Sequence, residues 1–297
     1  MDVALFFQAM LNGVLLGSLI SLVVVGLVLV LGVARVLNMA HGHILVLGAF
    51  FVWFFFVDIG IDVLSNPVSF VLALILAVAI VAALGIVLER VPFRRFQGNL
   101  IAGLVASVAI MMLIESLTME AWGTETKIVG SIWAGSTNFF GVVMSNWRWV
   151  IMAIGLILMG GVALYMQRTK MGRAMRASAS DPEAAALQGI NPITVSRLAM
   201  IIGFGLAAIG GGVMAPIYGV DLAVAMPWIL KGILAIVIGG PGSLGGCMVA
   251  ALALGMTESY FTTFVNPQAG YIAMFGLLIA VILVRPWGLF GRPIKGF

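Results

Sequence analysis

Three short segments hold the residues whose types and spacing point to chemistry or to a functional contact. In the first, Arg35, Asn38, His41 and His43 are crowded between two long apolar stretches. Imidazole and carboxamide groups can bind a metal or hydrogen-bond a polar solute, and at membrane depth such side chains normally face a cavity or a protein interior. His41 and His43 are two residues apart, so they do not share a helix face, and no carboxylate lies nearby in the sequence. The segment therefore indicates a polar path, or packed or interfacial imidazoles, rather than a metal site.

The second segment is a glycine-rich interruption of an apolar stretch between residues 236 and 255. Glycine and proline at this density cannot sustain a regular helix, so we expect apolar helices to open after each break, at Gly42 and at Gly246. Paired interruptions in the two halves of a membrane chain point to a substrate path, although small residues also allow close helix packing in lipid. The candidates for the translocation path or its hinges are Asn38, His41, Gly42, Gly239, Gly240, Gly242, Gly245 and Gly246.

A third segment, within residues 168–197, has the residues of a short capped helix. Asp181 is a good N-cap, and the proline that follows it is favoured at the first helical position. Glu183 lies where the helix dipole favours a carboxylate, and Gly189 can take the left-handed conformation that ends a helix. We predict a helix of about two turns, whose small, flat face can seat in a groove of another protein. The alternative is an ordinary connecting helix.

The composition places these segments in an integral membrane protein. Of the 297 residues, 63% are hydrophobic and only 9% are charged, and the mean hydropathy is +1.21. A soluble domain is about half apolar and about a quarter charged, so this chain has too few charges to cover a water-facing surface. This excludes a soluble enzyme, a secreted disulfide scaffold and a nucleic-acid binder. The single cysteine, Cys247, excludes an internal disulfide and a multi-cysteine metal site.

A helix needs roughly 20 apolar residues to cross the hydrocarbon core, and dividing the chain at its charges gives eight such runs. No run alternates strictly, as the strands of a membrane barrel would. Because backbone polar groups cannot be left bare in lipid, we predict an all-α polytopic fold of about 8–10 transmembrane helices with two glycine-interrupted segments. It forms a single transmembrane domain over residues 1–297. The apolar runs are 3–34, 36–57, 63–88, 96–114, 149–167, 198–220, 232–257 and 259–284.

Basic residues set the expected orientation. Lys and Arg collect in the connection that begins near Arg90, in residues 168–197, and at the C-terminus, where they are Arg285, Arg292 and Lys295. Cytoplasmic connections of membrane proteins carry an excess of Lys and Arg, so we expect these three regions in the cytoplasm. Residues 118–147 then form the main periplasmic loop. The side of the N-terminus depends on whether the broken segments cross fully, and it stays open.

The chain lacks an energy source of its own. It contains no Gly-x-x-x-x-Gly-Lys-Ser/Thr phosphate loop, so ATP that drives it must be bound by another chain. No acids are spaced along one span as in a proton relay, and no Ser/His/Asp or Cys/His set forms a catalytic centre. Glu115, Lys231 and Glu258 interrupt apolar runs; we expect interfacial side chains or an ion pair there, with gating as the alternative. We therefore expect no cofactor, metal or catalytic residue in this chain.

Five blocks along nearly the whole chain resemble one transporter family. The run Val36-Leu-Asn-Met-Ala-His-Gly-His43 resembles a signature of the branched-chain amino-acid ABC permeases, a family that also contains urea, amide and aromatic-acid permeases. Further blocks resemble that family in order and spacing, at residues 172–181, 187–191, 239–246 and 285–291. The resemblance implies the fold of a type II ABC importer permease.

The third segment carries a second resemblance. The run Glu183-Ala-Ala185 followed by Gly189 resembles the EAA loop of ABC importer permeases, although the Ile-x-Leu-Pro end of that signature is absent. In that family the loop is a coupling helix that docks on the ATP-binding subunit. The resemblance implies two ATP-binding cassette subunits that carry Mg-ATP, a second permease subunit (a paralogue or the same chain), a periplasmic substrate-binding protein, and the bacterial inner membrane. The residues implied in coupling are Asp181, Glu183, Ala184, Ala185 and Gly189.

Three functions are open on this basis. The leading hypothesis is the permease subunit of an ATP-driven importer, which moves a small polar solute such as a branched-chain or related amino acid by alternating access. The second is a channel for a small neutral solute such as urea or an amide, which explains the glycine breaks but not the capped helix. The third is an intramembrane enzyme that uses His41 and His43.

Overall fold

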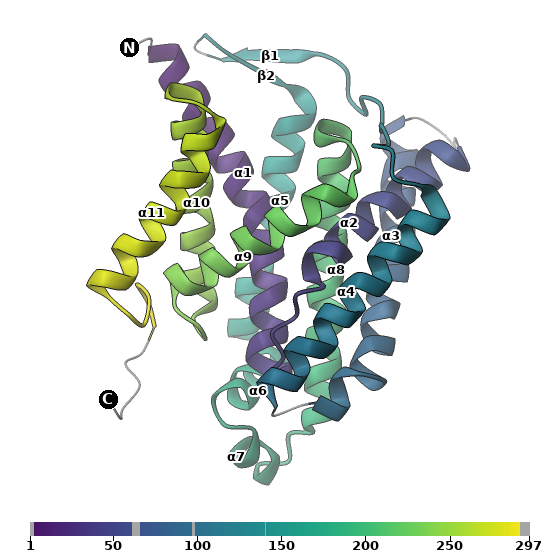
Figure 1. Ribbon diagram of the computed structural model, residues 1–297, viewed down its shortest axis with the longest axis vertical. Coiled ribbons are helices and arrows are strands. Elements are labelled where there is room, and N and C mark those ends of the chain that lie inside the picture. The colour runs from purple at the N-terminus through teal and green to yellow at the C-terminus, as the bar shows by residue number, and fades with distance from the viewer. Residues whose placement is uncertain (1–2, 61–65, 97–98, 140, 292–297) are drawn as a thin grey trace.

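The computed structural model describes residues 3–60, 66–96, 99–139 and 141–291, and it is a bundle of helices with one small hairpin (Figure 1). Within these residues, nine helices are long and apolar enough to cross a membrane, which confirms the predicted all-α polytopic fold. The spanning helices are α1 (Val3–Leu29, extended by the π-helical turn η1, Val30–Ala34), α2 (His41–Trp53, extended by η2, Phe54–Asp58), α3 (Asn66–Arg90), α4 (Leu100–Trp122), α5 (Asn146–Arg168), α8 (Pro192–Tyr218), α9 (Ala225–Gly239, preceded by η4, Leu222–Val224), α10 (Leu244–Phe264) and α11 (Pro267–Val284).

Short elements lie at the two ends of the bundle. The strands β1 (Ser136–Phe139) and β2 (Val142–Ser145) pair antiparallel at the end where α1 begins (Figure 1). The 3-10 turn η3 (Phe93–Phe96) and the helices α6 (Lys170–Ser180) and α7 (Pro182–Leu187) lie at the opposite end, toward which α11 runs. The two terminal helices thus begin and end on opposite sides of the bundle, as an odd number of crossings requires.

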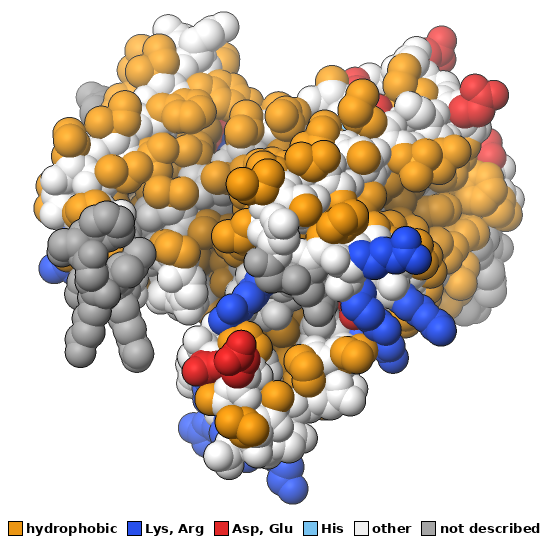
Figure 2. Space-filling view, turned by 60° about the horizontal axis from the view of Figure 1, so that its bottom comes forward, with side chains coloured by type: hydrophobic (Ala, Val, Ile, Leu, Met, Phe, Trp, Pro, Cys, Tyr) orange, Lys and Arg blue, Asp and Glu red, His pale blue; other side chains and the backbone are white. Residues whose placement is uncertain are grey.

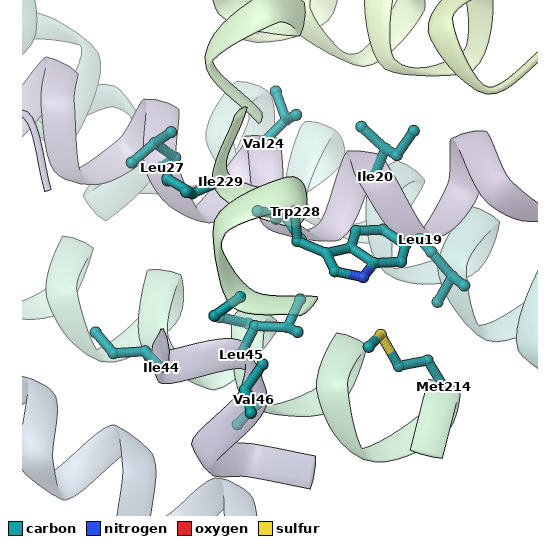
Figure 3. Packing of buried hydrophobic residues seen from close by; sticks show 14 of the residues in the cluster. Leu19, Ile20, Val24, Leu27, Ile44, Leu45, Val46, Met214, Trp228 and Ile229 are labelled. Atoms are coloured by element: carbon teal, nitrogen blue, oxygen red, sulfur yellow. The ribbon is translucent and has the colours of Figure 1, made fainter. Parts of the chain in front are cut away.

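The centre of the bundle is formed by α1 and α8. In the most apolar windows of these spans, 83% of the α1 residues and 78% of the α8 residues are buried, against 17% for α5 and α11. Figure 3 shows how α9 closes this core, because the indole of Trp228 lies between side chains of α1 and α8. Few residues of the peripheral helices α3, α4, α5 and α11 are buried, as expected for surfaces that face lipid or another subunit.

Three helix boundaries expected from the charges are wrong. The run 96–114 ends too early, because α4 continues through Glu115 to Trp122, so the loop expected over 118–147 covers only 123–145. The run 232–257 is not one span, because α9 ends at Gly239 and α10 begins at Leu244. The run 259–284 does not begin at the charge that precedes it either, because α10 continues through Glu258 to Phe264. Glu258 lies inside the span because its carboxylate pairs with the ammonium group of Lys231, 2.6 Å away. Its charge therefore does not mark the end of a helix. The second helices of the breaks open at His41 and Leu244 rather than at Gly42 and Gly246.

Part of the orientation argument rests on Arg292 and Lys295, which lie outside the described residues. Among the described residues, Lys and Arg side chains gather at the end that carries α6 and α7, which is turned toward the viewer in Figure 2. The flanks of the molecule in the same view are largely apolar. The segregation of basic side chains to one end matches the distribution expected for a protein that spans a bilayer.

Glycine permits the closest of the helix contacts. The most extensive helix pair is α1 with α10, where a Cβ atom at Gly255 would lie 2.5 Å from the Cα atom of Gly17. No real Cβ atom approaches that closely, so any side chain at this position must push the two backbones apart. Van der Waals packing of small residues is the main force that holds helices together in lipid, so the α1–α10 contact is an anchor of the fold.

We expect Gly255→Ala to lower the stability of the protein by about 1–3 kcal/mol, as overpacking of a close contact does. The matched control is Gly276→Ala in α11, where an added Cβ meets no atom within 4 Å. Thermal unfolding of the two variants in the same detergent measures the difference. Equal unfolding temperatures for the two variants would show that the α1–α10 contact is not tight.

Candidate functional site

The first break is a short irregular segment that connects α1 to α2. The η1 turn ends at Arg35, whose φ of 54° and ψ of 36° are left-handed. The Oδ1 atom of Asn38 accepts a hydrogen bond from the backbone N–H of Ala40 at 3.1 Å, which turns the chain into α2. The Oγ atom of Ser107 in α4 accepts from the N–H of Met39 at 3.0 Å. Side chains therefore supply the partners that the broken helix lacks, and they tie the break to α4.

The second break lies between α9 and α10 and is held by the chain's own C-terminal segment. Gly240 and Gly242 adopt positive φ values of 97° and 89°. The last carbonyl groups of α9 accept backbone hydrogen bonds from residues beyond α11: Leu289 N–H binds the Ile238 oxygen at 2.8 Å, and Phe290 N–H binds the Gly239 oxygen at 3.1 Å. The block 285–291 therefore caps α9, a contact between distant segments that the sequence pattern did not reveal.

The two breaks meet at one cavity of about 430 Å³. It lies toward the end of the bundle that carries α6 and α7, since the first residue of α4 and a residue of α6 contribute to its wall. Of the residues expected to form the path, Gly242 lines this cavity. The complete lining is Val28, Leu31, Gly32, Arg35, Leu100, Ala179, Ile236, Pro241 and Gly242.

The other path candidates of the first break lie inside the protein. Asn38 and His41 are fully buried. The His41 ring packs edge-on to Phe204 of α8, with ring centroids 6.0 Å apart, where Gly26 of α1 brings the helices close together. Gly42 lies so close to the backbone of Ala225 that any side chain there would collide with it. These residues hold α1, α2, α8 and α9 together, and their part in a translocation path stays a prediction.

The glycines of the second break differ from one another. Gly239 and Gly246 face each other across the turn, and a Cβ atom on Gly239 would lie 2.5 Å from the Gly246 carbonyl carbon. Gly240 is equally close to the backbone of Gly291 in the C-terminal segment. Gly245 has no atom within 4 Å of an added Cβ. Close packing thus explains three of these glycines, while a hinge or path role for Gly242 and Gly245 stays a prediction.

Two charged contacts lie inside the spans; the second is an ion pair of the kind expected among Glu115, Lys231 and Glu258, whereas the first was not foreseen. The Nε2 atom of His43 lies 3.5 Å from Glu115 of α4, so a carboxylate distant in sequence is its neighbour. The Nζ atom of Lys231 lies 2.6 Å from Glu258 and is within 5.5 Å of the ring centroids of Trp228 and Tyr271. The second pair joins α9 to α10 across the glycine break. Among the described residues, no group of three or more His, Cys, Asp or Glu could hold a metal ion.

The short capped helix forms as predicted. The Oδ1 atom of Asp181 accepts hydrogen bonds from the N–H groups of Glu183 and Ala184, both at 3.0 Å, and α7 ends before Gly189, whose φ is 81°. Ala184 and Ala185 lie within α7, where Ala185 is buried and Leu187 is 87% exposed. The structure confirms the helix start and end that the sequence predicted here, while the docking role of these residues stays a prediction.

A second helix in the same connection was missed. The helix α6 begins at Thr169, whose Oγ1 atom accepts from the N–H of Gly172 at 2.9 Å, and it buries Met175 and Ser178. Near its C-terminal end Ala179 reaches the wall of the cavity, and α7 follows after Asp181. The alternating basic and small residues of 170–180 were the available signal for an amphipathic helix. A continuous stretch of chain therefore leads from the exposed α7 to the cavity between the breaks.

A buried carboxylate braces the same end of the bundle. Glu89 is fully buried at the end of α3 and accepts two hydrogen bonds from the guanidinium of Arg94, at 2.7 and 3.2 Å. Arg197 of α8 lies 3.7 Å from the same carboxylate. The hydrogen bonds from Arg94 to Glu89 raise the pKa of that guanidinium above its ordinary value. The ion pairs connect the start of α8 to the turn between α3 and α4. They hold these segments together at the end of the bundle that carries α6 and α7.

This architecture defines the general class. The protein is a multi-pass helical membrane protein in which two interrupted segments converge on one cavity, as in transporters whose binding sites are built from discontinuous helices.

Comparison with known proteins gives the family. The model of the branched-chain amino acid transport system permease component matches residues 9–283. The high-affinity branched-chain amino acid transport system permease protein BraD of Pseudomonas aeruginosa is 30% identical, over 97% of this chain and 96% of the relative. The corresponding protein LivH of Escherichia coli K12 is 31% identical over the same shares, and a probable LivH of Methanocaldococcus jannaschii is 24% identical over 96% and 92%. No solved structure matches the chain.

The chain belongs to the family of branched-chain amino acid transport system permease components, because the family model spans nearly its whole length. The resemblance drawn from the five sequence blocks is thereby confirmed.

The ion pair between α9 and α10 generates a prediction. Lys231→Met leaves the Glu258 carboxylate buried without its partner, and we expect a loss of about 3–5 kcal/mol in stability. The double variant Lys231→Met with Glu258→Leu removes both charges and should lose less than the single variant. Thermal unfolding in detergent compares them. A single variant that unfolds at the wild-type temperature would show that the pair does not hold α9 against α10.

Proposed function

We propose that this chain is the permease subunit of an ATP-driven importer that carries branched-chain amino acids across the bacterial inner membrane. It works with a second permease subunit (a paralogue or a second copy), two ATP-binding cassette subunits that carry Mg-ATP, and a periplasmic substrate-binding protein. The observation that carries the proposal is the direct connection, through α6, between the exposed helix α7 and the cavity where the two breaks meet.

The lining of the cavity favours an aliphatic cargo over urea. Four of its residues have aliphatic side chains, and burial of an apolar cargo group against them is favourable by about 25 cal/mol per Å². Urea has no such group. The names of the relatives BraD and LivH state the same substrate class for those proteins. The aliphatic residues of the wall are Val28, Leu31, Leu100 and Ile236.

The transport step follows from the position of α7. Closure of the ATP-binding subunits moves α7, and α6 transmits the movement because the two helices are separated only by the capping residue Asp181. The wall of the cavity at Ala179 then shifts relative to the two breaks. The breaks lack the continuous hydrogen bonds of a helix, so the helices bend at these two places during transport. The solute path thereby alternates between the two sides of the membrane.

The exposed face of α7 fits a docking role. Leu187 is 87% exposed on a helix of six residues, and Glu183 places a carboxylate in its first turn. A large apolar side chain exposed beside charged groups is typical of a contact with another protein. We propose that Leu187 enters a groove of the ATP-binding subunit, with Asp181, Glu183, Ala184, Ala185 and Gly189 setting the shape and position of the helix.

The direct test is ATP-dependent uptake. The complete complex in proteoliposomes should accumulate radiolabelled leucine with ATP and the binding protein, and it should not accumulate radiolabelled urea. Removal of ATP or of the ATP-binding subunits should abolish the uptake. Leucine or urea flux through the permease alone would favour a channel and would contradict the proposal.

Two variants test the coupling role of α7. Glu183→Arg reverses a charge on the docking face, and Gly189→Leu places a bulky side chain at a φ of 81°. We expect both to assemble in the membrane but to reduce ATP hydrolysis coupled to transport by about tenfold or more, the scale of an unpaired charge at an interface. Arg90→Glu, a charge reversal on an exposed residue outside α7, is the control and should keep wild-type coupling. Wild-type coupling in both α7 variants would refute the role.

The orientation has its own test. The single cysteine is buried, so Cys247→Ser supplies a background free of thiols. In that background, Asn138→Cys in β1 should react with a membrane-impermeant maleimide added to intact cells, and Gln188→Cys beside α7 should react only after the membrane is opened. The reverse pattern would place α6, α7 and the C-terminus in the periplasm and would contradict the proposed coupling.

A further inference from the structure

The residue at the end of the first break has an unusual backbone. Among the described residues, Arg35 is the only one other than glycine with a positive φ. This left-handed conformation is the one in which glycine usually ends a helix, and an arginine in it costs about 1–2 kcal/mol. Such strain persists only where the surrounding structure imposes it, and it concentrates at functional sites. The guanidinium group is therefore a candidate for a function at this position.

The charge of Arg35 has no carboxylate partner in the part of the chain that the structure describes. Its side chain is exposed, and no carboxylate of the described residues lies within ion-pair distance of it. Arg94 and Arg197, at the same end of the bundle, both approach the carboxylate of Glu89. Arg35 instead lines the cavity where the two breaks meet. A planar guanidinium in a cavity can hold a carboxylate through two parallel hydrogen bonds.

The rest of the wall complements a carboxylate that carries an aliphatic side chain. The helix α4 begins at Leu100, so its positive dipole end lies on the same wall as Arg35 and favours an anionic group. The helix α9 ends at Gly239, next to the lining residues Pro241 and Gly242, and its last carbonyl groups are already bonded to Leu289 and Phe290. The same wall carries the aliphatic side chains of Val28, Leu31, Leu100 and Ile236. The cavity volume of about 430 Å³ has room for a single amino acid.

We propose that this cavity is a binding site for the transported amino acid on the α6 side of the membrane, and that Arg35 binds the substrate carboxylate there. The inference rests on the proposed function and adds to it the residue that recognises the substrate. The aliphatic wall takes the side chain. Because Ala179 of α6 is part of the same wall, movement of α7 and α6 changes the site directly and releases the substrate.

The test uses the purified permease complex without the substrate-binding protein. Binding of radiolabelled L-leucine is measured in the nucleotide-free state, with leucine and leucinol, which lacks the carboxylate, as competitors. Arg35→Asn removes the charge while keeping the backbone, because asparagine tolerates the left-handed region better than most residues. Arg35→Lys keeps the charge and loses the paired hydrogen bonds. Arg95→Asn, on an exposed arginine of η3 that lies outside the cavity, is the matched control.

We expect the wild type and Arg95→Asn to bind leucine at least about tenfold more tightly than leucinol, which corresponds to one charge-assisted contact. Arg35→Asn should lose that preference together with about tenfold in leucine affinity, and Arg35→Lys should keep part of both. Equal leucine affinity in Arg35→Asn and the wild type would overturn the proposal. Equal affinity of the wild type for leucine and leucinol, or no leucine binding to the wild type, would overturn it as well.

Uptake separates this inference from the proposed function. If the wild-type complex shows no ATP-dependent leucine uptake, the proposed function fails. If the wild type transports leucine while Arg35→Asn matches it in leucine binding and in the KM for uptake, the function stands and the carboxylate site alone is wrong.

Discussion

The structure depends on the rule that backbone polar groups within a membrane protein must find partners inside the protein. Two helices are interrupted, so some of their backbone groups have no partner within the helix. Different groups satisfy them at each break. At the first break, Asn38 and Ser107 supply side-chain acceptors to backbone N–H groups. At the second break, the amides of Leu289 and Phe290 bind the last carbonyl groups of α9. These contacts allow irregular backbone to exist inside the bundle, where it borders a cavity.

Rigid packing around the breaks confines movement to them. Glycine contacts fix α1 against α10, and the Lys231–Glu258 pair fixes α9 against α10. The carboxylate of Glu89 holds the connection between α3 and α4 to the start of α8. The helix α6 is the element of the cavity wall that continues directly into the exposed helix α7. In the proposed function, movement of α7 reaches the cavity wall through α6.

Local signals in the sequence predicted local structure well, whereas contacts between distant segments could not be predicted. The cap at Asp181 and the helix end at Gly189 depend on residues within a few positions, and both formed as expected. The expected start of the last span after Glu258 was wrong because its partner, Lys231, lies on another helix. The same reason hid the His43–Glu115 contact, the capping of α9 by residues 289–290, and the place of Arg35 in the cavity. The polar cluster located the first break and the glycine pattern located the second, but the glycine pattern did not distinguish glycines that pack from one that lines the cavity.

The central claim is that nucleotide-driven movement of α7 reaches the cavity through α6. Spin labels at Leu100 and Ala179, introduced as cysteines in the Cys247→Ser background, report the distance between the α4 and α6 sides of the cavity wall. Double electron–electron resonance on the complete complex then compares the nucleotide-free state with the state trapped by ATP. The coupling described above requires a different distance distribution in the two states. Identical distributions, in a complex that still hydrolyses ATP and transports, would contradict it.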